Sequence, residues 1–141
     1  MTTTTLNPVN TVNQANLSNL VDLIGRIALA AIFFLSGVGK LQNYEGSQQF
    51  LALAGLPEFL LPAVIVFEIV GSLLLVAGFQ TRLVALAFAG FSVATAVLYH
   101  SNLGDQIQFL MFYKNIAIAG GFLVLAANSA GGFSIDAHRR K

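Results

Sequence analysis

The chain has no cysteine, no tryptophan and only two histidines, and charged residues make up 9% of its 141 residues. The lack of cysteine excludes disulfides, thiol redox chemistry and thiolate metal ligands. His100 and His138 lie far apart in the sequence and form no evident haem ligand pair, so we expect neither a haem nor a metal site. A net charge of +1 argues against nucleic acid as a partner, because nucleic-acid-binding proteins carry clustered basic surface.

The N-terminal segment also lacks the features of a secretory signal peptide. Residues 1–18 contain no lysine, no arginine and no apolar run. A secretory signal peptide needs a basic start followed by an apolar core. We therefore expect residues 1–18 to form a disordered or loosely attached polar tail.

What the chain has in abundance is apolar sequence, with 56% hydrophobic residues. Four segments approach the length of about 20 mostly apolar residues that a membrane-spanning helix needs. A soluble helical core is the alternative, but it would require polar helix faces that these segments largely lack. The sequence predicts an all-α membrane protein, a four-transmembrane-helix bundle over residues 19–128 with a basic tail over residues 129–141. The predicted spans are residues 20–40, 59–79, 82–99 and 107–127.

The loop between the first two spans, residues 42–58, has an apolar side formed by residues such as Tyr44, Phe50 and Leu53. This pattern predicts a short amphipathic helix at the membrane interface. It could act as a lid over the bundle or simply as a connector that shields the helix ends.

Lysine and arginine near the span ends indicate the orientation, because cytoplasmic loops carry an excess of both. An even number of spans puts both termini on one side, which also holds Arg26, Arg82 and the basic C-terminal residues. The other side holds Lys40 and little else. The sequence therefore predicts that both termini are cytoplasmic.

Polar residues within the spans recur at spacings of three and four, together with small residues. Such positions share one helix face, and small residues mark the places where membrane helices approach closely. We therefore expect these faces to point into the bundle. They comprise Arg26, Ala30, Phe33, Gly37 and Lys40 in the first span, Glu68, Gly71, Ser72, Leu75 and Gly78 in the second, Arg82, Ala85, Ala89, Ser92, Ala96 and Tyr99 in the third, and Lys114, Ala117 and Gly121 in the fourth.

Glu68 and Lys114 should lie at the same depth, each about eight residues below the outer end of its span. An unpaired charge in the bilayer costs a few kcal/mol or more, so we expect the two side chains to pair, with Asn115 bridging to a neighbouring helix. The pair could be purely structural or part of a polar pocket for a small polar or quinone-like headgroup. That pocket would comprise Lys40, Glu68, Tyr99, His100, Lys114 and Asn115; a second polar cluster on the inner side, Asp22, Arg26 and Arg82, is interpreted as an interfacial anchor.

Three stretches in order resemble the DoxX family of small bacterial inner-membrane proteins. "GRIALAAIFFLSGVGKL" is similar to the family's first helix, "FEIVGSLLLVAGFQTRLVAL" to its second helix and following turn, and "FYKNIAIAGGFLVLAA" with "GGFSIDAHRR" to its final helix and tail. The resemblance covers about residues 20–138 and implies a four-helix bundle in the bacterial inner membrane.

The resemblance implies less about activity. Some DoxX-like proteins are subunits of quinone-linked oxidoreductases, and others are associated with oxidative-stress complexes. We expect a non-catalytic membrane subunit or anchor of such a complex, with the lipid bilayer, a redox protein or further copies of the chain as partners and a bound quinone as the cofactor to consider. The alternatives are a small-molecule binding protein or transporter with a pocket around Glu68 and Lys114, and an enzyme using Glu68 or His100 as acid or base.

Overall fold

A computed structural model describes residues 7–141, and within them every regular element is a helix. The helices are α1 (Pro8–Gln42), α2 (Tyr44–Leu53), the 3₁₀ turn η1 (Glu58–Leu60), α3 (Leu61–Ala77), α4 (Thr81–Tyr99), α5 (Gln106–Asn128) and α6 (Ile135–Arg139). Four of them, α1, α3 with η1, α4 and α5, are long and apolar enough to cross a membrane. The predicted all-α fold with four spans is confirmed.

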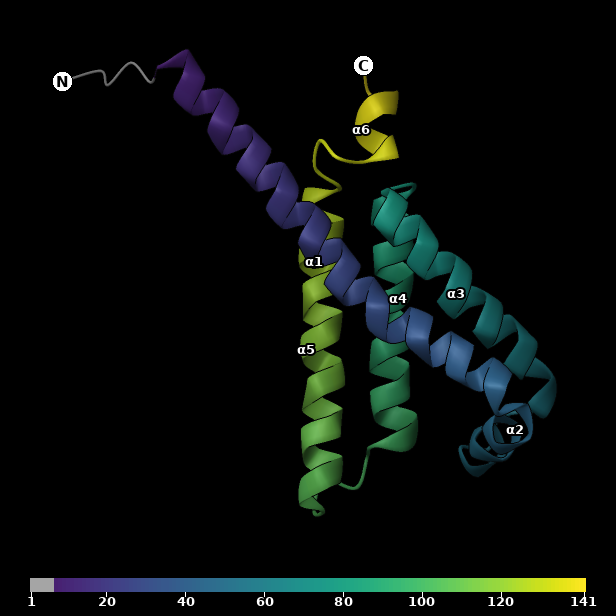
Figure 1. Cartoon of the computed structure of the whole chain (residues 1–141). Coiled ribbons are helices and arrows are strands. Elements are labelled where there is room, and N and C mark those ends of the chain that lie inside the picture. The colour runs from purple at the N-terminus through teal and green to yellow at the C-terminus, as the bar shows by residue number, and fades with distance from the viewer. Residues whose placement is uncertain (1–6) are drawn as a thin grey trace.

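The N-terminal segment differs from its prediction, because α1 begins at Pro8 and the expected tail is helical from that residue onward. Proline is favourable in a first helical turn, and the Asn7 side chain accepts a hydrogen bond from the Val9 amide at 3.3 Å. The segment continues a long helix, so it needs no new helix nucleus. Its residues are exposed and project beyond the other helices (Figure 1). Residues 1–6 of the predicted tail lie outside the described part.

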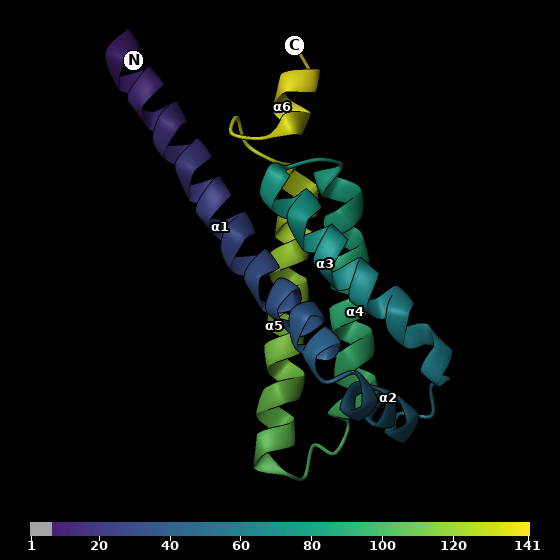
Figure 2. The same ribbon diagram turned by 45° about the vertical axis from the view of Figure 1, so that its right-hand side comes forward.

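The spans are arranged as two helix pairs. Most helix–helix contacts lie within the α1–α3 pair and within the α4–α5 pair. The α1–α3 pair crosses the α4–α5 pair obliquely, and the two pairs diverge toward the end where α2 lies (Figures 1 and 2). We call this end of the bundle the α2 end and the opposite one the α6 end.

Phenylalanine side chains fill the place where the two pairs cross. The ring centroid of Phe88 on α4 lies 4.6 Å from that of Phe33 on α1, 4.6 Å from that of Phe67 on α3 and 5.3 Å from that of Phe122 on α5. Gly71 of α3 makes room for this ring, since a Cβ atom there would lie 2.7 Å from Phe88. This aromatic core, with Phe91 at its edge, joins all four spans.

The predicted inward faces are confirmed for most of α1, α3 and α4 but not for α5. Arg26, Glu68 and Ser92 are all buried with their small neighbours. On α5, Lys114 and Ala117 are instead exposed. The buried residues of α5 are Ala119, Phe122, Leu125 and Ala126. Because α5 is apolar all round, its sequence does not define which face packs against the bundle.

Gly37 allows α1 to approach α3 closely. A Cβ atom at this position would lie 2.7 Å from Ile69 Cγ1 and 3.2 Å from Glu68 Cβ. Gly37→Ala should therefore lower the free energy of unfolding by about 1–3 kcal/mol, the usual cost of overpacking. Thermal unfolding of the purified protein in detergent measures the loss.

The matched control for this substitution is Gly25→Ala on the same helix, where an added Cβ has nothing within 4 Å. Alanine there should leave the unfolding temperature unchanged or raise it, because alanine is the better helix former. Equal effects of the two substitutions would show that close approach at Gly37 does not limit the packing.

Candidate functional site: a pocket between the helix pairs

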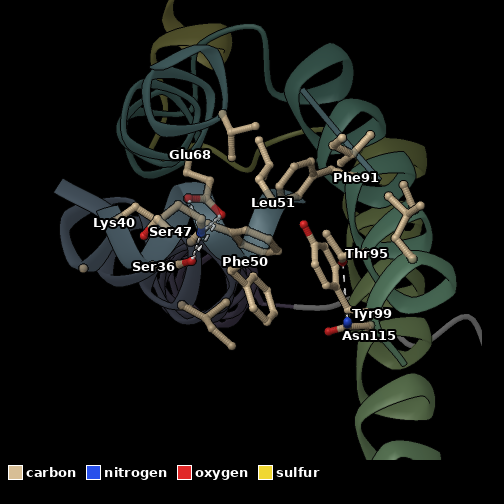
Figure 3. A pocket seen from close by; sticks show the side chains of 18 of the residues that line it. Ser36, Lys40, Ser47, Phe50, Leu51, Glu68, Phe91, Thr95, Tyr99 and Asn115 are labelled. Atoms are coloured by element: carbon tan, nitrogen blue, oxygen red, sulfur yellow. Dashed lines mark hydrogen bonds and ion pairs between the residues drawn. The ribbon is translucent and has the colours of Figure 1, made fainter. Parts of the chain in front are cut away.

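A pocket with a cavity volume of about 680 Å³ opens between the diverging pairs at the α2 end. Side chains from α1, α2, α3, α4 and α5 all line it, and Phe33 and Phe91 connect it to the aromatic core. Its lining is mostly apolar. The polar side chains stand on two opposite sides (Figure 3).

On the first side, Lys40 of α1 forms an ion pair with Glu68 of α3. The Lys40 Nζ atom lies 2.9 and 3.0 Å from the two carboxylate oxygens and donates to the Ser36 hydroxyl at 2.6 Å. Ser36 in turn donates to Glu68 at 3.2 Å. The Glu68 side chain is 3% exposed and the Lys40 side chain 22%. The charges therefore cancel within the lining, and the Lys40 side chain is the more exposed of the two.

The pairing of Glu68 with Lys114 predicted from the sequence is wrong. Glu68 lies on α3, which packs against α1, whereas Lys114 lies on α5, which packs against α4. Lys114 is exposed, and its ammonium contacts Met111 Sδ at 3.4 Å. Equal depth is thus not sufficient for pairing, since helix adjacency and helix rotation decide which charges meet.

On the second side stand Thr95, Tyr99 and Asn115. The Asn115 amide of α5 donates to the Thr95 hydroxyl of α4 at 3.4 Å, which confirms the predicted bridge to a neighbouring helix. Tyr99 stacks on Phe50 of α2, with ring centroids 4.4 Å apart and planes 4° from parallel. Figure 3 shows these groups across the pocket from the Lys40–Glu68 pair.

Helix α2 covers the pocket and contributes Ser47, Phe50 and Leu51 to its lining. The helix starts because the Asn43 side chain accepts a hydrogen bond from the Gly46 amide at 3.2 Å, a typical N-cap. Leu51 is buried against Leu61 and the rest of α3. The predicted helix in this loop is therefore present; its position at the membrane interface stays a prediction.

Four of the six predicted pocket residues line the pocket, namely Lys40, Glu68, Tyr99 and Asn115. Lys114 does not, and His100 lies at the end of α4, where its Nδ1 atom is 2.8 Å from the Gln108 side chain. Sequence reasoning missed Ser36 and Thr95. Each stands four residues before a predicted pocket residue, Lys40 and Tyr99 respectively, so helical spacing could have found both.

At the α6 end, Arg26 is fully buried. Its guanidinium donates to the Asp22 carboxylate at 2.9 Å, to the carbonyls of Leu75 and Val76 at 2.9 and 2.7 Å, and to the carbonyl of Phe133. The Asp22 carboxylate also accepts from the Gly131 amide at 2.9 Å. Arg26 and Asp22 therefore join α1, the end of α3 and the C-terminal segment.

Arg82, the third residue of the predicted inner cluster, lies apart from the other two. It is exposed, and its Nε atom donates to the Ala126 carbonyl at 3.0 Å. Asp136 of α6 is close by and accepts from the Gln80 and Thr81 amides at 2.9 and 2.8 Å. Burial raises the pKa of the Asp136 carboxyl, but these hydrogen bonds and the charge of Arg140 outweigh burial, so the pKa lies below its ordinary value.

Comparison with known proteins places these features in a family. The DoxX family model matches residues 21–101. The chain is 46% identical over 111 residues to the inner membrane protein YqjF of Escherichia coli K12, which covers 79% of this chain and 85% of YqjF. The chain belongs to the DoxX family. This confirms the resemblance, and the four apolar helices agree with the membrane location given in the name of the relative.

The chain is also similar to two further proteins. The inner membrane protein YphA of Escherichia coli K12 is 38% identical over 118 residues, which is 79% of this chain and 84% of YphA. "Putative oxidoreductase CatD" of Bacillus subtilis 168 is 38% identical over 64 residues, which is 45% of this chain and 48% of that protein. No solved structure matches the chain significantly.

A double-mutant cycle can measure the coupling energy between Lys40 and Glu68. Lys40→Met and Glu68→Gln should each destabilise the protein, because each leaves one charge without its partner, while the double variant should cost less than the sum. The coupling energy should be about 0.5–3 kcal/mol. Thermal or denaturant unfolding of the four proteins in detergent measures it.

Lys114 provides the matched control for this cycle. Lys114→Gln combined with Glu68→Gln should give additive losses, because the two side chains do not meet. Additive losses for Lys40 and Glu68 together with coupling between Lys114 and Glu68 would restore the pairing predicted from the sequence.

Proposed function

We propose that this DoxX-family protein binds a lipophilic small molecule with a hydrogen-bonding headgroup, of the quinone class, in the pocket between the helix pairs. The observation that carries the proposal is the lining of that pocket, which is largely apolar but holds the Lys40–Glu68 pair on one side and Asn115 with Thr95 on the other. Its volume of about 680 Å³ is within the range typical of small-molecule sites. Ionisable residues within membrane spans commonly mark functional sites.

The donors and rings of the lining fit a quinone. A quinone carbonyl oxygen accepts hydrogen bonds, and the second side of the lining offers the Asn115 amide and the Tyr99 hydroxyl as donors. The three N–H groups of the Lys40 ammonium are already directed at Glu68 and Ser36. Phe50, Phe91 and Tyr99 offer aromatic faces for a flat ring. A bound quinone would supply reversible two-electron chemistry. The residues of this chain would bind and orient its headgroup and exclude water.

A second candidate function is that of a non-catalytic membrane subunit or anchor of a redox complex. It is favoured by the similarity to CatD, whose name refers to oxidoreductase activity. The chain itself has no cysteine, so thiol redox chemistry would have to come from a partner. The two functions are compatible, since a subunit can hold the quinone that its complex oxidises or reduces.

Native mass spectrometry of the protein extracted gently from its own membrane tests both functions. We expect a retained small molecule whose mass matches a quinone, and its loss in Asn115→Leu, because leucine removes the amide donor from the pocket lining. A protein partner of fixed stoichiometry in the same spectrum would add the subunit function.

Lys114→Gln is the control, because Lys114 is a charged residue of the same spans outside the pocket. It should retain the molecule at the wild-type level. Wild-type protein that carries no small molecule, and that also fails to bind an alkyl benzoquinone added in detergent, would refute the quinone-binding proposal.

We also propose the orientation with both termini in the cytoplasm, which places the α6 end inside and α2 at the outer surface. Arg82, Arg139, Arg140 and Lys141 all lie at the α6 end, and cytoplasmic ends of spans are rich in such residues. A reporter fused after Lys141 should be active in the cytoplasm. A reporter that is active only in the periplasm would reverse the orientation.

A further inference from the structure

A second hollow lies at the α6 end, outside the pocket described above, with a volume of about 340 Å³. The turn after α3, the start of α4, the residue after α5 and the helix α6 all contribute to it. Its lining residues are Gln80, Thr81, Arg82, Ser129, Asp136, Arg139 and Arg140. We call it the arginine hollow.

The lining of the arginine hollow contains three arginines and one carboxylate. These numbers leave the hollow with an excess of positive charge. The oxygens of the carboxylate, Asp136, already accept hydrogen bonds from the amides of Gln80 and Thr81. Because Asp136 already accepts hydrogen bonds from the amides at the start of α4, the guanidinium groups are the donors that remain for a ligand.

The arginines are held in place by contacts that use few of their donors. Arg82 Nε donates to the Ala126 carbonyl at 3.0 Å, and Arg140 Nη2 donates to the Ala130 carbonyl at 3.0 Å. The Arg139 guanidinium stands 5.3 Å from the centre of the Phe79 ring. Each guanidinium carries five N–H donors, so most of them remain free of protein acceptors within residues 7–141.

Thr81 adds a buried polar group to the hollow. Its side chain is fully buried, and its hydroxyl lies within reach of the Asp136 carboxyl. The hydroxyl therefore belongs to the packing around Asp136, and the arginines are the groups that a ligand meets.

We propose that the arginine hollow binds a phosphate group, and that at the membrane surface an anionic phospholipid carries it. Guanidinium groups match the geometry of phosphate oxygens and bind them through paired hydrogen bonds. The hollow lies at the ends of three spans, α3, α4 and α5, with Phe79 against Arg139 and the exposed Leu83 next to Arg82 in the sequence. An acyl chain can therefore follow the helix surface while the phosphate occupies the hollow. This site is independent of the quinone proposal.

Lipid retention tests the proposal. Full-length protein is delipidated in a neutral detergent, and phosphatidylglycerol or diacylglycerol with the same acyl chains is added before native mass spectrometry. We expect phosphatidylglycerol to be retained and diacylglycerol, which lacks the phosphate, to be lost. Arg139→Gln should reduce the retained phosphatidylglycerol about fivefold, the usual effect of one basic residue at an anionic surface.

Two control variants separate a built site from general charge. Arg139→Lys keeps the charge but loses the paired donors of the guanidinium, so it should retain less phosphatidylglycerol than the wild type and more than Arg139→Gln. Lys141→Gln removes a neighbouring charge that does not line the hollow and should bind as the wild type does. Arg139 makes no hydrogen bond to the described residues, and its replacement removes only the cation–π contact with Phe79. The unfolding temperature of Arg139→Gln should therefore fall only slightly, which verifies that the variant is folded.

Inorganic phosphate distinguishes the two sources of the ligand. If phosphate raises the unfolding temperature of the wild type but not of Arg139→Gln, the hollow recognises phosphate itself. If millimolar phosphate also displaces the bound phosphatidylglycerol, the site belongs to the free ion. Equal retention of the two lipids, or equal losses in Arg139→Gln and Lys141→Gln, would overturn the proposal.

Discussion

The buried Arg26 guanidinium is the contact on which the rest of the bundle depends. The last carbonyls of a helix lack partners within that helix, and in a membrane such groups cannot turn to water. Arg26 satisfies the Leu75 and Val76 carbonyls at the end of α3 and the Phe133 carbonyl of the C-terminal segment. Gly78 makes this possible. It adopts a positive φ of 69°, and a Cβ atom there would lie 2.8 Å from the Arg26 guanidinium and closer still to Ser134.

Closing the bundle at the α6 end leaves the helix pairs free to diverge at the α2 end. The aromatic core around Phe88 lies between the two ends and keeps the pairs in contact at their crossing. Beyond it, α1 and α3 separate from α4 and α5, and α2 covers the space that results. The Lys40–Glu68 pair lies at this divergence. It joins α1 to α3 and leaves the lining of the space without net charge.

The sequence predicted the spans well because their apolar runs are long, and it predicted the faces of α1 and α3 because Arg26 and Glu68 cannot face lipid unpaired. It failed for α5, where residues on all sides are apolar and the one charge, Lys114, turned out to be exposed. That failure also produced the wrong partner for Glu68. The start of α1 was missed because polar residues 8–18 resemble a tail by composition, whereas the helix extends through them from the span that follows.

The two polar ends of the molecule differ in charge, and this difference defines what each can hold. In the pocket at the α2 end, the Lys40 ammonium is paired with Glu68, so a ligand meets dipoles and rings rather than net charge. A neutral molecule with hydrogen-bonding oxygens matches such a lining, whereas an anion would compete with Glu68 for Lys40. In the arginine hollow, Asp136 accepts hydrogen bonds from two backbone amides, and three arginines surround this one carboxylate. A phosphate group matches that surplus, so the two proposed sites, one for a neutral headgroup and one for an anionic group, would lie at opposite ends of the spans.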